Sequence, residues 1–109
     1  MDKKLFIALY TPEALSDLSM LDRQNQKRVY RAVGLFEQLG TDAGNSRPLN
    51  KDGLFELKAD KVRIYFKYYE EKIIIVGLIT LKKTQKAPER YKTQAVVSIN
   101  RYIKSKNKE

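Results

Sequence analysis

Residues 54–81 constrain the fold more than any other part of the sequence. Apolar and polar side chains alternate from 54 to 58 and again from 62 to 69, which is the period of a half-buried strand. Residues 73–81 are almost continuously apolar, which is typical of a central strand buried on both faces. Short polar connections at 59–61 and 70–71 favour tight turns. We therefore expect three consecutive strands of one mostly antiparallel sheet.

The alternation also assigns side chains to the two faces of this sheet. Phe55 and Leu57 point one way, and Glu56 and Lys58 point the other. In the next strand the two alternating sets are Val62, Ile64, Phe66 and Tyr68 against Arg63, Tyr65, Lys67 and Tyr69. A slip of one residue would bury Glu56, Lys58 and Arg63 together. We expect these three charged residues to share the face opposite the helices.

The N-terminal part of the chain predicts one strand and two helices. Residues 3–10 have the length and composition of a strand, with Leu5, Ile7 and Leu9 on one face. Thr11 and Pro12 mark the start of a short helix, and Asp22 caps a longer one that ends near residue 39. We expect the two helices to form an antiparallel hairpin. The inward-facing residues would be Leu15, Leu18 and Leu21 in the first helix and Val29, Val33, Phe36 and Leu39 in the second.

The outer face of the second helix is basic, carrying Arg23, Lys27, Arg28 and Arg31. Gly40 ends this helix, and residues 41–52 indicate a connecting loop because they are rich in Gly, Asn and Asp. Pro88 begins a last helix that runs to about residue 104 with an apolar stripe. The order β-α-α-β-β-β-α predicts a single α+β domain over residues 1–109, with all helices packed on one face of the sheet.

Composition excludes several kinds of chemistry. The chain has no cysteine and no histidine, so zinc–thiolate sites, cysteine nucleophiles and Ser-His-Asp triads are impossible. We expect no metal and no small-molecule cofactor. No stretch approaches the roughly 18 apolar residues that a membrane-spanning helix needs, and the N-terminus lacks a secretory signal pattern. The expected location is the cytoplasm, away from the membrane.

Positive charge is concentrated near the C-terminus. The net charge is +9, and residues 82–109 contain nine basic and two acidic side chains. Such a block favours a polyanion or an acidic protein as partner. For the segment 104–108 alone, a basic tail that only increases solubility is an equally good interpretation.

The predicted charged face of the sheet has the residue types that a single-stranded RNA would need. Arginine offers a planar fork for a scissile phosphate, a carboxylate can take the proton of a 2′-hydroxyl, and aromatic rings stack on bases. Glu56 and Arg63 are the informative pair. The alternative is a solvated face of cross-strand ion pairs worth about 0.2–1 kcal/mol each. On that alternative, Tyr91 begins the core stripe of the last helix, and Tyr65 and Tyr69 serve in packing.

Several segments together resemble the RelE/ParE superfamily of toxins from type II toxin–antitoxin systems. They are Gly53-Leu54-Phe55-Glu56-Leu57-Lys58, Arg63-Ile64-Tyr65, and the run Leu81-Lys82-Lys83-Thr84-Gln85-Lys86-Ala87-Pro88 followed by Ala95. The last run is most similar to the HigB-like branch. The resemblance implies a RelE-like, microbial-RNase-like fold and a ribosome-dependent mRNA interferase, an endoribonuclease that cuts mRNA by metal-independent attack of the 2′-hydroxyl.

The resemblance also implies roles for individual residues. Arg63 would hold the phosphate with help from Lys58, while Lys83 would stabilise charge and Tyr91 would stack on a base or act as acid. Lys82 and Lys86, with Lys67 and Tyr65 of the sheet face, would bind RNA. The general base stays open between Glu56 and a lysine.

The expected partners are the ribosome, mRNA and an acidic antitoxin with a helix-turn-helix domain, encoded next to the toxin. The alternative within the superfamily is a ParE-like toxin that binds DNA gyrase and cuts nothing.

Overall fold

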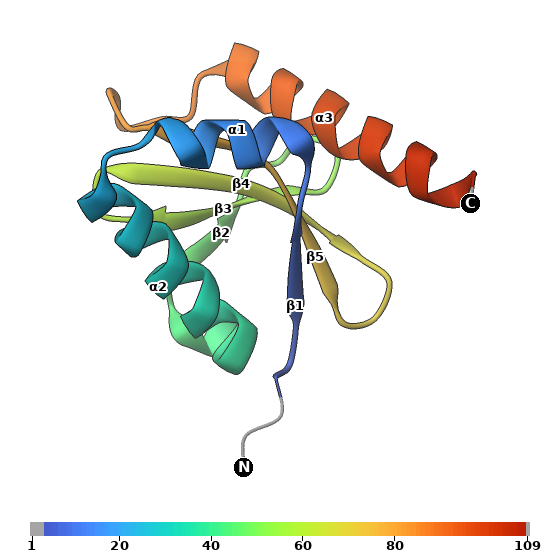
Figure 1. The fold of residues 1–109 in the computed structure, drawn as a ribbon, viewed down its shortest axis with the longest axis horizontal. Helices are drawn as coiled ribbons and strands as arrows, with labels where there is room; N and C mark the ends of the chain where they lie inside the picture. The colour runs from blue at the N-terminus through green and yellow to red at the C-terminus, as the bar shows by residue number, and fades with distance from the viewer. Residues whose placement is uncertain (1–3, 109) are drawn as a thin grey trace.

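The computed structural model describes residues 4–108 and shows one five-stranded sheet with three α-helices (Figure 1). The strands are β1 (Ile7–Tyr10), β2 (Ser46–Pro48), β3 (Leu54–Ala59), β4 (Val62–Tyr69) and β5 (Ile73–Leu81). The helices are α1 (Pro12–Met20), α2 (Arg23–Leu39) and α3 (Glu89–Asn107), with a short 3-10 helix η1 (Gly40–Ala43). The strand order is β1-β5-β4-β3-β2, and within residues 4–108 only β1 with β5 is a parallel pair. The predicted α+β class and mostly antiparallel sheet are confirmed.

Helices cover both faces of the sheet, so the expectation that all helices pack on one face is wrong. The first core cluster joins residues of α1 and α2 to Leu57, Ile64 and Phe66. The second cluster joins Ala95 and Ile99 of α3 to side chains of the opposite sheet face, including those of β5. Because β5 is apolar on both faces, each face needs its own cover.

The strand faces follow the predicted alternation. Phe55, Leu57 and the even-numbered residues of β4 belong to the first cluster or pack against it, whereas Tyr65 belongs to the second. The register has a bulge between Tyr65 and Phe66, which pair with Leu78 and Val76 and leave Gly77 between them. The bulge shifts the pairing of β5 by one residue while keeping both faces packed.

The two N-terminal helices begin at the predicted caps. The side chains of Thr11 and Asp22 accept hydrogen bonds from the backbone N–H groups of Ala14 and Asn25. The expected helical hairpin is wrong, because α1 packs chiefly on β5 while α2 packs on β1, β3 and β4. In Figure 1, α1 crosses the upper part of the view and α2 turns away from it.

Two positions expected to be inward-facing are exposed. Leu15 and Leu39 lie at the surface, because the buried stripes pass through Ala14 and Leu18 in α1 and end at Phe36 in α2. The first strand is also shorter than predicted and begins at Ile7, while residue 3 of the expected strand lies outside the described residues.

Residues 41–52 are more ordered than the predicted loop. They contain most of η1 and the whole of β2, which pairs antiparallel with β3 and places Arg47 opposite Glu56. Gly40 ends α2 with a φ of 59°, a left-handed conformation that glycine adopts without strain.

None of the helices within residues 4–108 is long and apolar enough to cross a membrane. The same residues contain no group of three acidic side chains placed to hold a metal ion.

Candidate nucleic-acid interface

Glu56 and Arg63 lie on the same face of the sheet and contact each other. Oε1 of Glu56 is 2.6 Å from Nε of Arg63. The register allows this contact, because it pairs Glu56 with Tyr65 and Lys58 with Arg63. The expectation that this face is uncovered is wrong for both residues. Their side chains are 0% and 1% exposed, so neither can reach a substrate in this arrangement.

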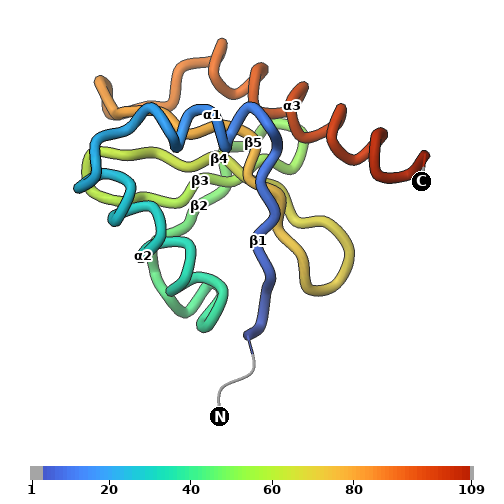
Figure 2. Tube along the Cα trace, in the orientation of Figure 1, coloured from blue at the N-terminus to red at the C-terminus, as the bar shows by residue number. Residues whose placement is uncertain are grey.

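The cover over Arg63 is the segment 82–88, which connects β5 to α3 and is visible as the orange loop of the trace in Figure 2. Nη2 of Arg63 donates hydrogen bonds to the backbone carbonyl oxygens of Gln85 at 3.1 Å and Thr84 at 3.4 Å. Arg63 therefore ties this loop to the sheet. Its guanidinium already has a carboxylate and two carbonyls as partners, so the structure places it as an anchor for the loop.

The buried cluster around Glu56 is incompletely hydrogen-bonded. Arg47 pairs with Oε2 of Glu56 from β2, whereas the close Oε1–Nε contact with Arg63 is an ion pair without aligned hydrogen-bond geometry. The buried hydroxyl of Tyr65 also lacks a well-aligned partner, and burial raises the pKa of this phenol. Buried charges are costly to desolvate, so this cluster contributes less to stability than its short contacts imply.

Exposed cations surround the loop. Lys58, Lys83 and Lys86 are exposed and Lys82 is partly exposed; we call these four residues the loop surface. The backbone N–H of Lys82 donates to the carbonyl of Lys61 at 2.7 Å, which holds the loop beside the β3–β4 turn. A hollow of about 310 Å³ is lined by Lys82, Lys83, Thr84 and Gln85. This surface can bind an anion such as a phosphate.

Tyr91 lies in the first turn of α3, directly after the loop. Its ring is partly buried against the second core cluster, as the packing interpretation predicted. Its hydroxyl accepts a hydrogen bond from Arg90 Nη2 at 3.3 Å. Hydrogen bonds from Lys92 and Lys51 lower the pKa of Glu89, and the one from Lys51 ties the start of α3 to the segment before β3. Tyr91 is thus positioned by packing and retains a polar tip.

Two residues expected to bind RNA are less available than predicted. Tyr65 is fully buried, so its ring cannot stack on a base in this structure. Lys67 is partly exposed, and its Nζ is 3.5 Å from Oδ1 of Asn100 in α3.

Arg47 belongs to the same cluster and was missed from the sequence. Its side chain is 44% exposed, and residues 41–52 carried no alternating pattern that would have revealed β2.

The arrangement of strands and helices is that of RelE. It is similar to the solved RelBE2 toxin–antitoxin complex of Mycobacterium tuberculosis, with a TM-score of 0.61, 16% identity and coverage of 71% of this chain and 98% of that one. It is also similar to the archaeal RelE–RelB complex of Pyrococcus horikoshii OT3, with a TM-score of 0.60, 12% identity and coverage of 72% and 97%. The predicted likeness to the RelE/ParE superfamily is confirmed as a fold.

The chain belongs to the family described as Phage derived protein Gp49-like (DUF891), whose model matches residues 16–100. No curated protein matches the sequence significantly. The HigB-like assignment stays a prediction.

Proposed function

We propose that this protein is the toxin of a type II toxin–antitoxin system and acts as a ribosome-dependent endoribonuclease on mRNA. The observation that carries the proposal is the combination of a RelE fold with a cationic loop surface at the end of the sheet. Two solved chains with this fold come from the RelBE2 and RelE–RelB complexes, which supports an acidic antitoxin as partner. A basic toxin of this charge would be neutralised by such a partner.

The burial of Glu56 and Arg63 changes the roles proposed for individual residues. Arg63 and Glu56 become positioning residues, because they hold the loop and its lysines in place. Lys83 stabilises the charge that develops on the scissile phosphate, and Lys82 and Lys86 bind the RNA strand. Of the two kinds of base left open by the sequence, a lysine is preferred, and Lys58 is the exposed cross-strand neighbour of Arg63.

In the proposed reaction the ribose 2′-oxygen attacks the adjacent phosphorus and the bond from phosphorus to the 5′-oxygen breaks. The 2′-hydroxyl proton passes to the base, and the 5′-oxygen takes a proton from the Tyr91 hydroxyl. The guanidinium of Arg90, 3.3 Å from that hydroxyl, then stabilises the phenolate. The products are a 2′,3′-cyclic phosphate and a 5′-hydroxyl, and no metal ion takes part.

Induction of the protein in bacterial cells, followed by mapping of mRNA ends, tests this proposal. We expect cuts at fixed codon positions with wild type and a strong loss with Lys58→Met/Lys83→Met, since a lost general base and a lost donor each cost roughly 10²-fold or more. Lys104→Met/Lys106→Met is the matched control, because it removes the same charge from exposed positions of α3. The proposal is contradicted if mRNA stays intact in cells that express the wild-type protein. It is also contradicted if the two double variants lose cleavage to the same extent.

A second candidate is a ParE-like inhibitor that binds DNA gyrase without cutting RNA. The burial of Arg63 and its contacts with Glu56 and the loop favour it, because an arginine committed to a loop is not free to hold a phosphate. In that case induction changes plasmid supercoiling while mRNA stays intact, and a topoisomer gel from the same cells distinguishes the two functions.

A further inference from the structure

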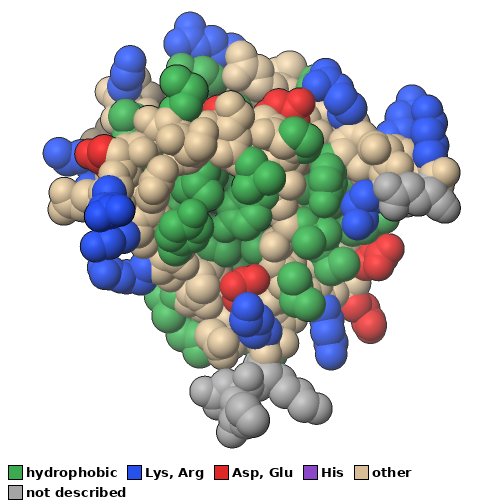
Figure 3. Space-filling model, in the orientation of Figure 1, with side chains coloured by type: hydrophobic (Ala, Val, Ile, Leu, Met, Phe, Trp, Pro, Cys, Tyr) green, Lys and Arg blue, Asp and Glu red, His purple; other side chains and the backbone are tan. Residues whose placement is uncertain are grey.

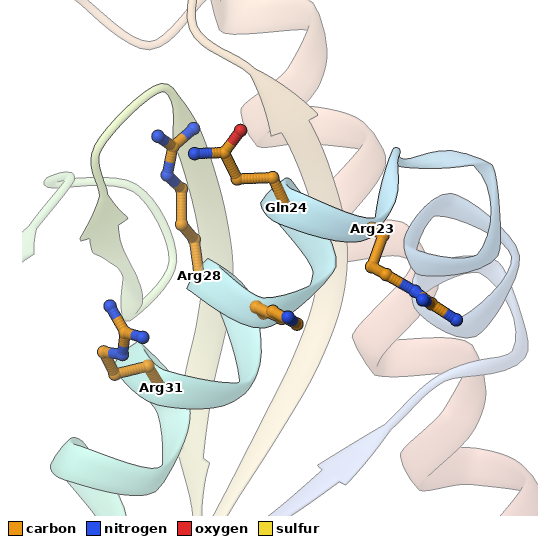
Figure 4. Close-up of a pocket in the computed structure, with 5 residues that line it drawn as sticks. Arg23, Gln24, Arg28 and Arg31 are labelled. Carbon is orange, nitrogen blue, oxygen red and sulfur yellow. The ribbon is translucent and has the colours of Figure 1, made fainter.

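The outer face of α2 forms a second basic surface, separate from the loop surface. Arg23, Lys27, Arg28 and Arg31 are spaced at i, i+4, i+5 and i+8, which places them on one side of a helix. With Gln24 they line a hollow of about 580 Å³. Figure 4 shows Gln24, Arg28 and Arg31 extending from the same side of α2, with Arg23 reaching away from them. We call these five residues the α2 surface.

The charges of the α2 surface are poorly compensated. None of the five lining residues is acidic. Arg28 pairs with Asp60 at 3.1 Å, but Arg23, Lys27 and Arg31 have no ion-pair partner among the described residues. Like charges at this spacing destabilise a helix by about 0.2–0.5 kcal/mol per pair. A cost of this kind is offset when the face binds a polyanion.

The α2 surface continues toward the loop surface. A neighbouring hollow of about 440 Å³ shares Arg28 and Arg31 with it and extends to Lys58 at the end of β3. From there the β3–β4 turn reaches the loop, since the carbonyl of Lys61 accepts a hydrogen bond from the N–H of Lys82. Asp60, which pairs with Arg28, also lines this hollow, so the path from α2 to the loop is cationic except at that pair.

We propose that the α2 surface binds the phosphate backbone of double-helical RNA, beside the strand that the loop surface holds. This inference deepens the proposed function and rests on it for the location of the cut strand. None of the five lining residues is aromatic or apolar. A single strand would be held by stacking on aromatic rings, and an amphipathic peptide by an apolar groove. A duplex hides its bases and presents phosphates, which match arginine forks.

Fluorescence anisotropy with a 16-base-pair RNA duplex tests the inference across a range of KCl concentrations. The variant is Arg23→Gln/Lys27→Gln/Arg31→Gln, which leaves the Arg28–Asp60 pair intact. The matched control, Lys104→Gln/Lys106→Gln/Lys108→Gln, removes the same charge from exposed residues at the C-terminal end of α3. Losing three phosphate contacts should reduce the salt slope of log K by about 2–3 and the affinity at 0.1 M salt by roughly 100-fold. The control should change the slope by less than about 1.

Equal losses in the two triple variants would overturn the inference, because they would indicate dependence on total charge alone. Poly-L-glutamate, used as a second probe, distinguishes an acidic protein partner from an RNA duplex. If it binds wild type as tightly as the duplex does and loses the same affinity in the α2 variant, the surface is a protein site and the inference fails.

Cleavage is scored separately with an unstructured mRNA in a purified translation system that contains ribosomes. If the wild-type protein cleaves the mRNA but the α2 variant keeps its affinity for the duplex, only this inference fails. If duplex binding depends on the α2 surface but no cleavage is seen, the proposed nuclease activity fails and the inference about the α2 surface holds.

Discussion

Gly77 allows α3 to lie directly on the sheet. A β-carbon at this position would be 2.8 Å from the carbonyl oxygen of Ala95 and would collide with the side chain of Ile99. Both of these residues are fully buried in the second core cluster. The missing side chain therefore sets the distance between α3 and β5.

We predict that Gly77→Ala lowers the free energy of unfolding by about 1–3 kcal/mol, the usual cost of overpacking a core. Gly34→Ala in α2 is the control, because a β-carbon added there would meet nothing within 4 Å; it should raise the free energy of unfolding by about 0.5–1 kcal/mol. Urea unfolding followed by circular dichroism measures both. A neutral Gly77→Ala would show that α3 moves away without penalty.

Tyr10 makes stability depend on alkaline pH. Burial, reinforced by the charge of Glu37, raises its pKa from 10.0 to about 12. The folded state therefore keeps the phenol proton at a pH where the unfolded chain has lost it, so stability falls as pH rises from 10 to 12. Between pH 9 and 11 we expect this group to cost about 1.3 kcal/mol.

The variant Tyr10→Phe checks this expectation. Its free energy of unfolding should decline less than that of wild type over the same pH interval, by the amount that Tyr10 contributes. Urea titrations of both proteins at pH 9 and 11 measure the difference. Parallel declines would mean that the hydroxyl is as accessible to solvent in the folded protein as in the unfolded one.

Among the elements, the loop 82–88 is held to the sheet in part by the buried side chain of Arg63. Arg63 donates to two of its carbonyls, while Lys83 to Lys86 are exposed. Hydrogen bonds from a charged group are worth about 1.5–3 kcal/mol each. The loop should therefore open more often when Arg63 is replaced.

We predict that Arg63→Lys, which keeps the charge but loses the fork, speeds trypsin cleavage after Lys82, Lys83 or Lys86. An increase of roughly 10- to 100-fold follows from losing one such hydrogen bond. Lys67→Arg, a matched exchange of cations on the same sheet face, should leave the rate unchanged. Mass spectrometry of timed digests identifies the cut sites, and far-UV circular dichroism checks the fold. An unchanged rate for Arg63→Lys would show that the loop is held by other contacts.

The elements with clear periodicity were predictable, and those defined by tertiary contacts were not. Alternation identified the strands β3 and β4 and the shared face of Glu56 and Arg63, and the caps at Thr11 and Asp22 identified α1 and α2. β2 was missed because three residues, one of them Pro48, carry no readable period. The burial of Arg63 was missed because the covering loop is polar and nothing local indicates where it folds.

At the scale of the whole molecule, the view in Figure 3 shows hydrophobic side chains gathered in the middle of one face with Lys and Arg side chains around its edge. The exposed apolar residues include Leu15 and Met20 of α1 and Tyr30 and Leu35 of α2. The cations of the loop surface and the α2 surface are the two places that we propose for anionic partners. The proposed function requires one partner that inhibits the protein and another on which it acts.

We have proposed that this protein cuts mRNA on the ribosome. The direct measurement uses a purified translation system with one defined mRNA, with and without ribosomes, and determines the chemistry of the new ends. We expect cuts only when ribosomes translate the mRNA, with 5′-hydroxyl ends downstream and 2′,3′-cyclic phosphates upstream. Intact mRNA in the translating reaction, or cuts that leave 5′-phosphate ends, would contradict it.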